Sequence, residues 1–322
     1  MSVRCVVCRK PVPKAEKAVF DTRFGIDALY GVTRCPSCGL EQTFPAPSQG
    51  ELKRLYAGHY NFSGLSGTAY TGLRERFLFS PLYRLWLLMD GDISFHGRKG
   101  RGRLLDIGCN EGRGLVMCRN NGWDAEGIEL NGAAAKAAQS RGFKVRTGTI
   151  DGFRPEEPYD AAVLSNVLEH STDPKGILSH VSRVLKPGGQ VWISCPNSRS
   201  WLRAVFGRRW INWHVPFHIA HFSGDTLCAL LESSGFKVVE IRHRTPALWA
   251  AHSIISALFA RKGRPTKELR NALLVASLTL SVRGLFFPAL WLGNALGHGD
   301  CLVVTAEKCC RPAPTNRMLK KS

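Results

Sequence analysis

A glycine-rich turn between an apolar run and a helical segment is the first stretch whose residues are suited to chemistry. The run Leu104–Ile107 predicts a buried strand, and a turn with Gly108, Gly112 and Gly114 follows it. Glycine lets the backbone turn tightly and lets a ligand approach without a Cβ in the way. A helix that begins after such a turn offers unpaired N–H groups to a ligand. The sequence therefore predicts a nucleotide-type binding loop.

The order of the glycines indicates which nucleotide the loop holds. A dinucleotide loop reads G-x-G-x-x-G, whereas here the order is G-x-x-x-G-x-G with Asp106 before the first glycine. This resembles motif I of class I S-adenosylmethionine-dependent methyltransferases, D-x-G-x-G-x-G, with Asn110 in place of the middle glycine; Asn tolerates a positive φ better than most residues. An acidic residue for the ribose is expected about 20 residues on, where Glu129 stands. The alternative is a glycine-rich turn of another α/β protein.

The resemblance implies that the cofactor is S-adenosyl-L-methionine. We expect Asp106, Gly108 and Gly112 around its amino-acid part and Glu129 on its ribose. Cys109 is interpreted as a packing residue beside the ligand. The full set of predicted cofactor-binding residues is Asp106, Gly108, Cys109, Asn110, Gly112, Glu129, Leu130 and Asn166.

Four cysteines near the N-terminus have the spacing of a metal site. Cys5 and Cys8 form one C-x-x-C pair, and Cys35 and Cys38 form another after 26 intervening residues. Two such pairs supply the four thiolates of a tetrahedral zinc site. A catalytic zinc would need an open position, so this Zn²⁺ is predicted to be structural, in a zinc ribbon. A chance arrangement of structural thiols is the alternative.

The composition indicates a globular enzyme with an unusual charge. The chain has 322 residues, 44% of them hydrophobic and 21% charged, and a formal net charge of +19. Such a charge favours polyanions: nucleic acid, anionic lipid head groups or nucleotide-linked substrates. The basic residues are spread out, however, and form no arginine-rich arm. No secretory signal is recognisable, and the eleven cysteines favour metal binding over disulfides, so we expect a cytoplasmic protein.

Strand and helix patterns alternate regularly after the glycine loop, which predicts βαβ units and a parallel sheet. The fold class is therefore α/β: a doubly wound, mostly parallel seven-stranded sheet of the Rossmann-like methyltransferase type, with an N-terminal zinc ribbon and a C-terminal helical insertion. The predicted strands are 104–107, 125–130, 144–147, 159–165 and 190–194, with 236–243 and 301–307 as a final antiparallel pair. The predicted helices between them are 115–122, 133–141 and 177–185.

The same patterns divide the chain into five parts. These are a zinc ribbon (1–47), a helical linker or lid (48–100), the methyltransferase core (101–244), an apolar helical insertion (245–298) and a last strand with a basic tail (299–322). The insertion is too long for a plain loop and should carry structure of its own.

Three further stretches resemble motifs of one methyltransferase subgroup. They are Asn166–Pro174, Leu185–Gly189 and Phe217–Ser223. A leading Cys₄ ribbon, a Pro-rich turn and a Tyr-containing helix also resemble this subgroup. Some of its members are sugar C-methyltransferases, and others are uncharacterised proteins associated with polysaccharide or lipid modification. The resemblance implies that His170 and His218 occupy active-site histidine positions.

Three histidines are the predicted catalytic residues: His218, His170 and His221. They follow the fourth and fifth predicted strands, at the carboxyl edge where doubly wound sheets bind ligands. Methyl transfer to a hydroxyl or an acidic carbon needs a base, and imidazole titrates near neutral pH. The alternative is that these histidines only satisfy backbone groups around the cofactor.

Signatures of two other acceptor classes are missing. Methylation of base amino groups often uses an (Asp/Asn)-Pro-Pro-(Tyr/Phe) turn, but here the fourth strand leads into Ser165-Asn-Val-Leu. Cytosine C5 chemistry needs a nucleophilic cysteine. Cys195 lies before a proline but follows the fifth strand, so we interpret it as a small buried residue.

The insertion is strongly apolar. The segments 272–282 and 284–293 form a nearly continuous apolar run, 247–260 is a second one, and the basic stretch 261–265 follows it. Buried helices that cover the active site are one interpretation. The other is peripheral contact of 247–297 with the inner face of a membrane, with the basic residues on anionic head groups.

Three functions remain open at this stage. The first is a methyltransferase acting on a small-molecule or lipid-linked acceptor, of which a sugar is one kind. The second is an rRNA or tRNA methyltransferase in which the ribbon and the basic surface bind RNA, although scattered charge and the lack of an aromatic-rich RNA-binding element count against it. The third is a non-catalytic binding module, against which the intact Asp106, Gly108, Gly112 and Glu129 argue.

Overall fold

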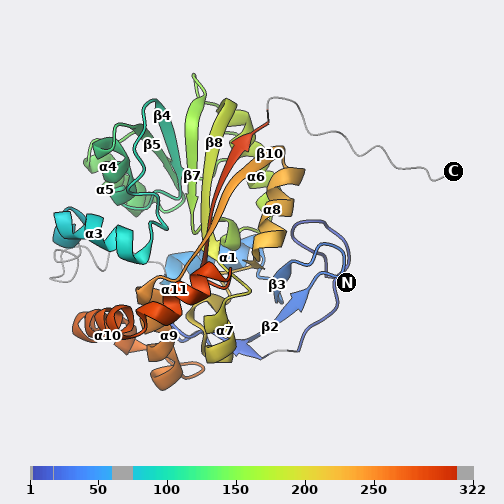
Figure 1. The fold of residues 1–322 in the computed structure, drawn as a ribbon. Coiled ribbons are helices and arrows are strands. Elements are labelled where there is room, and N and C mark those ends of the chain that lie inside the picture. The colour runs from blue at the N-terminus through green and yellow to red at the C-terminus, as the bar shows by residue number, and fades with distance from the viewer. Residues whose placement is uncertain (1–2, 17, 60–74, 310–322) are drawn as a thin grey trace.

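The main sheet has seven strands with the order β10-β11-β8-β7-β4-β5-β6 (Figure 1). The computed structural model describes residues 3–16, 18–59 and 75–309. Strands β4 to β8 pair in parallel, and β11 lies antiparallel between β8 and β10. The strands are β4 (Arg103–Ile107), β5 (Asp124–Glu129), β6 (Val145–Thr147), β7 (Tyr159–Ser165), β8 (Leu185–Pro196), β10 (Phe236–Arg244) and β11 (Cys301–Lys308). The predicted fold class is confirmed.

Helices cover both faces of this sheet. Helices α4 (Arg113–Asn120) and α5 (Gly132–Ser140) lie on one side, and α6 (Pro174–Val184) and α8 (Gly224–Ser233) lie on the other (Figure 1). Each face of the sheet packs against its helices in a separate hydrophobic core. Successive strand residues point into opposite cores, because side chains alternate across a strand. Leu104 packs with the α4 and α5 side, and Leu105 packs with the α6 and α8 side.

Local sequence signals explain where these helices begin. Asn131 caps α5 by accepting hydrogen bonds from the backbone N–H groups of Ala133 and Ala134. Asp173 caps α6 in the same way, so this helix begins at Pro174, three residues before the predicted start at residue 177. Strand β8 also begins earlier than predicted, at Leu185, which pairs with Tyr159 of β7.

The N-terminal segment forms a second, four-stranded antiparallel sheet with a strand from the far end of the core. Strands β1 (Val19–Phe20), β2 (Leu29–Arg34) and β3 (Glu41–Phe44) are followed in space by β9 (Ala220–His221). Side chains of this segment, Cys35 among them, belong to the same buried cluster as the main sheet. The N-terminal segment is therefore packed into the core, and it reaches the loop that carries His218.

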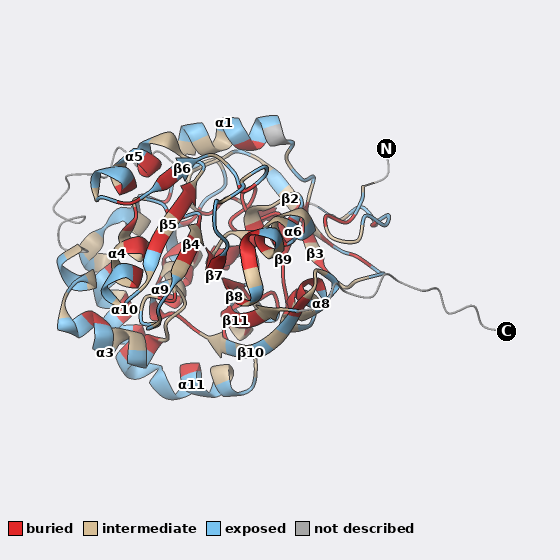
Figure 2. Cartoon of the chain, turned by 90° about the horizontal axis from the view of Figure 1, so that it is seen from above, coloured by how far each residue is buried: buried red, intermediate tan, exposed pale blue. Residues whose placement is uncertain are grey.

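Helices α1 (Gln49–His59) and α3 (Pro81–Asp90) follow that segment in the chain and precede β4. The segment between β10 and β11 carries α9 (Ala247–Phe259), a short 3-10 helix (Lys267–Arg270), α10 (Ala272–Leu285) and α11 (Phe287–Ala295). The helical insertion is thus confirmed. Its helix α9 is largely buried, whereas α3, α10 and α11 lie at the rim of the molecule with much exposed surface (Figure 2). The basic tail after residue 309 lies outside the described residues.

No single helix in the described part of the chain is long and apolar enough to cross a membrane. Helices α10 and α11 meet the length and composition test only when taken together, and they are bent by 71° at their junction.

Candidate active site

The glycine loop adopts the left-handed backbone conformations that its sequence predicted. Gly108, Asn110 and Gly112 have φ angles of 80°, 53° and 78°. At Gly112 a Cβ would lie 2.8 Å from the Cβ of Ala138, so a larger residue would push α5 away. Helix α4 begins directly after Gly112 without a side-chain cap, which leaves its first N–H groups available to a ligand.

Glu129, at the end of β5, lies opposite the glycine loop. Its carboxylate accepts hydrogen bonds from the backbone N–H of Asn110 at 2.9 Å and from that of Asn131 at 2.7 Å. These bonds fix the carboxylate between the two loops, where its remaining lone pairs can accept from hydroxyl groups. The next residue, Leu130, is exposed. This is the arrangement expected for a ribose site.

Asp106 lies half-buried at the end of β4, beside the loop. Burial raises the pKa of Asp106 to about 7, and the nearby Glu129 carboxylate adds to the shift. The carboxylate is close to the backbone of α4, since a Cβ on Gly114 would lie 3.1 Å from its Oδ2. A bound cation would favour the ionised form of this group.

Two further predicted cofactor-binding residues, Cys109 and Asn166, lie in or near the glycine loop. The Cys109 thiol points into the core, where a Cβ on Gly127 would lie only 2.4 Å from its Sγ. This geometry supports its interpretation as a packing residue. Asn166, directly after β7, has a positive φ of 55°, and its N–H donates to the carbonyl of Ser194 at 2.8 Å. Its side chain therefore stands at the same edge of the sheet as the glycine loop.

The rings of His170 and His218 contact each other, and His170 lies five residues after the end of β7. Their ring centroids are 4.6 Å apart, and the ring of His214 lies 4.7 Å from that of His218. The Nδ1 of His218 lies 2.8 Å from the carbonyl oxygen of Asn212, so Nδ1 carries the proton and donates it. The Nε2 of His218 is consequently the acceptor nitrogen of the neutral ring, and it lies 3.3 Å from the Nδ1 of His214. Burial and then the neighbouring His170 lower the pKa of His218 well below its usual value.

Glu169 adds a carboxylate to this group. Its side chain is buried, and neither carboxylate oxygen has a hydrogen-bond partner in the described part of the chain. Burial raises the pKa of Glu169 to about 8. One ligand atom each of Glu169, His170 and His218 lie within 4.8 Å of one another, a donor set that can share a proton or hold a divalent metal.

His221 has a different environment from the other two predicted catalytic histidines. Its Nε2 lies 3.0 Å from the hydroxyl of Thr43, which itself donates to the carbonyl oxygen of His218 at 2.6 Å. The ring is buried and packs edge-on against Trp213. These contacts favour a structural role for His221, that of joining β3 to the loop that carries His218.

Two side chains of this site were not found by sequence reasoning. Tyr56, on α1, places its hydroxyl 2.8 Å from the Nδ1 of His170. His214 contacts His218 at 3.3 Å and has a positive φ of 39°. His214 could have been found from the sequence, because it lies four residues before His218. No local pattern predicts the contact of Tyr56 with His170. The rings of Phe24 and Phe217 complete the wall, with Phe217 edge-on to both Phe24 and Tyr56.

The four N-terminal cysteines converge as their spacing predicted. Their Sγ atoms all lie within 4.8 Å of one another, and Cys5–Cys38 and Cys8–Cys35 are each 3.5 Å apart. Burial would raise the pKa of Cys35, but hydrogen bonds from the backbone of Cys38 and Ser37 and from the Cys8 thiol lower it to about 7. Four convergent thiols with a stabilised thiolate fit a tetrahedral Zn²⁺ site.

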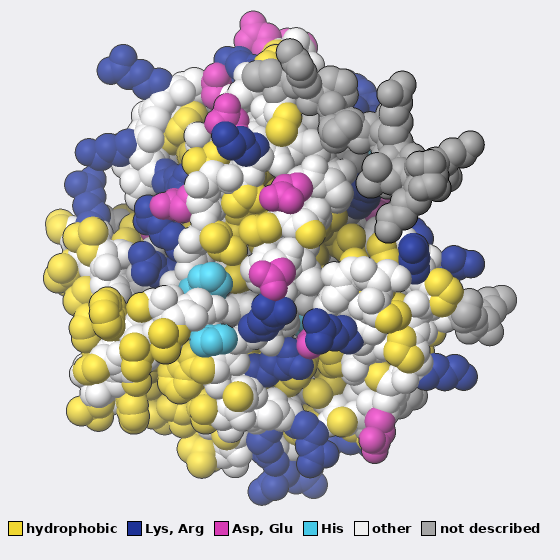
Figure 3. Space-filling view, turned by 45° about the vertical axis from the view of Figure 1, so that its right-hand side comes forward, with side chains coloured by type: hydrophobic (Ala, Val, Ile, Leu, Met, Phe, Trp, Pro, Cys, Tyr) yellow, Lys and Arg dark blue, Asp and Glu magenta, His cyan; other side chains and the backbone are white. Residues whose placement is uncertain are grey.

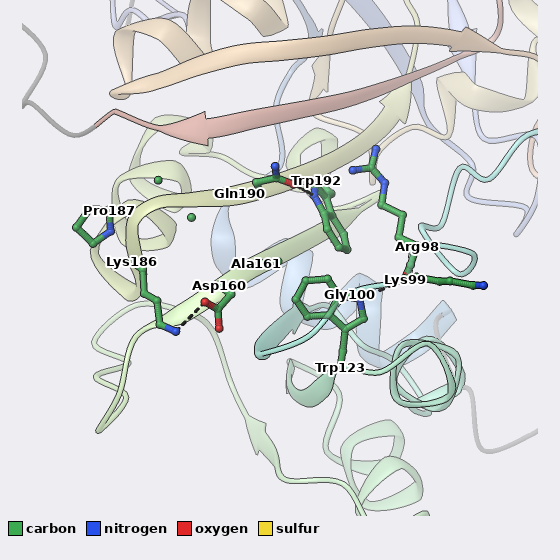
Figure 4. A pocket seen from close by; sticks show the side chains of 12 residues that line it. Arg98, Lys99, Gly100, Trp123, Asp160, Ala161, Lys186, Pro187, Gln190 and Trp192 are labelled. Atoms are coloured by element: carbon green, nitrogen blue, oxygen red, sulfur yellow. Dashed lines mark hydrogen bonds and ion pairs between the residues drawn. The ribbon is translucent and has the colours of Figure 1, made fainter.

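A pocket of about 550 Å³ lies elsewhere, at the amino ends of the parallel strands. Figure 4 shows the ring of Trp192 above that of Trp123, with Arg98 to their right and the Lys186–Asp160 ion pair at the left. Asp160 is the second residue of β7, whereas Asn166 follows its last. Doubly wound sheets bind ligands at the carboxyl edge, so this pocket is not the cofactor site.

The strand order, the glycine loop and the acidic residue at the end of β5 together define a Rossmann-like methyltransferase fold. A family model described as "Methyltransferase domain" matches residues 73–241, which is more than half of the chain. The protein belongs to this methyltransferase domain family.

Proteins to which the chain is similar include ubiquinone biosynthesis O-methyltransferases. The one from Nitrosospira multiformis is 32% identical over 143 residues, covering 41% of this chain and 60% of that protein. The one from Burkholderia ambifaria is 32% identical over 178 residues, covering 51% of this chain and 77% of that protein. The first of these matches thus spans less than two thirds of the relative's length.

Solved structures with a similar fold include a SAM-dependent methyltransferase from Archaeoglobus fulgidus. It has 22% identity and a TM-score of 0.46, and the alignment covers 75% of this chain and all of that one. A 1,6-didemethyltoxoflavin-N1-methyltransferase from Burkholderia thailandensis has 16% identity and a TM-score of 0.45, with 88% and 97% covered.

Proposed function

We propose that this protein transfers a methyl group from S-adenosyl-L-methionine to a small-molecule or lipid-linked acceptor. The observation that carries the proposal is the carboxylate of Glu129, held by the N–H groups of Asn110 and Asn131 across from the glycine loop. Bound S-adenosylmethionine supplies an electrophilic methyl group on its sulfonium. The protein's part is to hold the donor and the acceptor in line and to take up a proton.

Each part of the cofactor has a group of this chain suited to it. The Asp106 carboxylate suits the amino group, and the uncapped N-terminus of α4 suits the carboxylate of the same amino-acid part. Glu129 suits the ribose hydroxyls, and the exposed Leu130 offers an apolar contact for the base. Asn166 follows the last residue of β7, four residues before His170.

His218 is proposed as the base that accepts the proton of the methyl acceptor. Its Nε2 is the nitrogen that can accept a proton, because Nδ1 donates to Asn212; in this structure Nε2 faces the Nδ1 of His214 at 3.3 Å. A buried neutral imidazole is ready to accept a proton but holds it weakly, since burial lowers its pKa. Glu169 lies close enough to the imidazole to share that proton. His170 is held by Tyr56 and is proposed to orient the acceptor.

The nature of the acceptor is proposed on two grounds. The relatives named above are ubiquinone biosynthesis O-methyltransferases, which favours a small ring-shaped acceptor. The motif resemblance favours a sugar and methylation at carbon. The rings of Phe24, Tyr56 and Phe217 beside the histidines can pack against either kind of ring.

The test of this function is a comparison of metabolites and lipids by mass spectrometry. A strain that lacks the gene should accumulate an acceptor one methyl group lighter than its product. Complementation with the wild type should restore the product, and complementation with Glu129→Ala should not. Restoration by neither protein, with no mass shift in any small molecule or lipid, would contradict the proposal, as would a methyl group missing from RNA alone.

We further propose that the four cysteines bind one structural Zn²⁺. The site has four protein ligands and therefore no open position for a substrate. Purified protein should contain one zinc per chain, and Cys35→Ser should lose it. Because β3 joins the His218 loop through β9 and Thr43, loss of zinc should also lower methyl transfer. Metal-free wild-type protein with four freely titratable thiols would contradict this.

A further inference from the structure

The outer surface of α10 and α11 is apolar where a water-facing surface normally carries charge. Between residues 272 and 296 the only charged residue is Arg283, and its side chain is buried. The exposed side chains of the two helices include Leu273, Leu280, Leu285, Phe287, Trp291 and Leu296. We call these six residues the apolar face. Leu273, Leu285 and Trp291 are 82%, 76% and 62% exposed, so this face is not a core boundary.

The apolar face is continued by a third helix and is rigidly held. Leu82, Leu85 and Leu88 of α3 are also exposed. The buried Arg283 forms an ion pair with the buried Asp90 at the end of α3, and so ties α10 to that helix. Figure 3 shows hydrophobic side chains gathered at the lower left, in the part of the molecule where Figure 1 places α9, α10 and α11. An exposed apolar patch of this extent marks an interaction surface.

A group of cations borders this surface at the N-terminal end of α10. Arg261, Lys262, Arg264, Lys267 and Arg270 are all exposed, and Glu268 is the one acidic residue among them. Lys262 pairs with Asp27. For the other four no ion pair is found in the described ranges. The stretch follows Leu258 and Phe259, exposed at the end of α9, and it leads directly into α10.

We propose that this surface docks the protein on an anionic lipid membrane, with the apolar face in the interfacial layer and the cations on the head groups. An interfacial attachment suits an apolar surface with a basic border. Helices α10 and α11 are bent by 71°, which lets both lie along a surface. A second copy of the chain is a poorer occupant, because a two-fold interface would bring two identical groups of cations toward each other.

The docking surface is one layer away from the active site. Helix α9 connects them: its buried side faces the His218 loop, where the Ser253 hydroxyl accepts a hydrogen bond from the N–H of Ile211. Thr266, inside the cationic stretch, donates to the carbonyl oxygen of Thr22, next to the Phe24 wall. The docking surface and the loop that carries His218 are therefore joined through α9 and the cationic stretch. Membrane docking is a property beyond the proposed methyl transfer. It is tested by vesicle binding, which does not depend on enzymatic activity.

The experiment is co-sedimentation of the full-length protein with vesicles of phosphatidylcholine alone or with added phosphatidylglycerol. We expect binding to the anionic vesicles that weakens with salt. Leu285→Gln/Trp291→Gln should weaken binding at least about tenfold, because two exposed apolar anchors are lost. The matched control is Leu29→Gln/Val239→Gln, which changes two exposed apolar residues outside the surface and should bind as the wild type does.

A second pair of variants tests the cations. Arg264→Gln/Lys267→Gln/Arg270→Gln should weaken binding to anionic vesicles by roughly 100-fold, since each cation near such a surface contributes about fivefold. Lys136→Gln/Lys175→Gln/Lys237→Gln removes the same charge from other exposed positions and should have a small effect. Three results would overturn the proposal: no binding to anionic vesicles, equal loss in variants and controls, or a dimer in sedimentation velocity that Leu285→Gln/Trp291→Gln dissociates.

Discussion

Polar side chains are buried around His218, whereas apolar side chains are exposed along α10 and α11. In the first region His214, His218 and Glu169 are almost fully buried, and in the second Leu273, Leu285 and neighbouring residues face outward. Both arrangements cost free energy in an isolated chain, because buried polar groups lose water and exposed apolar groups order it. The difference indicates two kinds of binding region. The buried polar side chains suit a small ligand, and the exposed apolar side chains suit a broad surface.

The two regions also differ in how far the chain itself offsets that cost. In the histidine cluster His218 donates to Asn212 and His221 contacts Thr43, whereas the Glu169 carboxylate has no hydrogen-bond partner among the residues that the structure describes. On α10 the one charge, Arg283, is satisfied by Asp90, and the exposed apolar side chains are left uncovered. Changes in the first region should therefore affect chemistry, and changes beneath the second should affect stability.

The largest effect is expected for His218→Ala. Loss of a general base typically lowers turnover by about 10²–10⁴-fold, and kcat should fall by that factor while cofactor affinity is kept. His298→Ala removes an exposed imidazole at the end of the insertion and should leave kcat unchanged. Steady-state kinetics with the acceptor identified by mass spectrometry is the measurement. Near-normal turnover in His218→Ala would show that His218 is structural and would shift attention to His170.

Next in size is Arg283→Met, which tests the support beneath the apolar face. Removing one partner of a buried ion pair leaves an uncompensated charge, here Asp90, and should lower the free energy of unfolding by about 3–5 kcal/mol. Arg242→Met breaks an exposed pair with Glu240 and should cost less than about 1 kcal/mol. Urea denaturation compares the two. Equal small effects would mean that α10 is not anchored through Asp90.

A smaller effect is expected for the pH dependence of cofactor binding. Partial burial raises the pKa of Asp106 to about 7, so the carboxyl is mostly protonated at pH 6 and mostly ionised at pH 8. An amino group binds the ionised form, so affinity should fall roughly tenfold from pH 8 to pH 6. Calorimetry with S-adenosylhomocysteine at both pH values measures this. Asp106→Asn should flatten the dependence, and a flat profile in the wild type would contradict the role of Asp106.

Much of the core could be predicted from the sequence because its signals are local. The glycine loop, the left-handed Asn110 and the alternation of strands and helices depend on neighbouring residues, and they appear as expected. The four cysteines converge because two C-x-x-C turns fix each pair within a few residues. Glu129 was found at a fixed distance after the loop, since one helix and one strand separate them.

The rest depends on contacts between distant segments. The pairing of β3 with β9 and the contact of Tyr56 with His170 join residues more than 100 positions apart, and no local pattern encodes them. The apolar insertion was open to two interpretations for a related reason. Apolar periodicity shows that a helix has an apolar face, but whether the chain covers that face depends on its packing. Each interpretation fits one part of the insertion. Helix α9 is largely buried, whereas α10 and α11 are largely exposed.

The most direct test of the account is the affinity of Glu129→Ala for S-adenosylhomocysteine, measured by isothermal titration calorimetry. The wild type should bind one molecule per chain, and the variant should lose about 1.5–3 kcal/mol, the contribution of a hydrogen bond to a charged group. Glu156→Ala, which removes an exposed carboxylate before β7, should bind as the wild type does. Thermal unfolding should show both variants folded. Wild-type affinity in Glu129→Ala would remove Glu129 from the cofactor site and contradict the account.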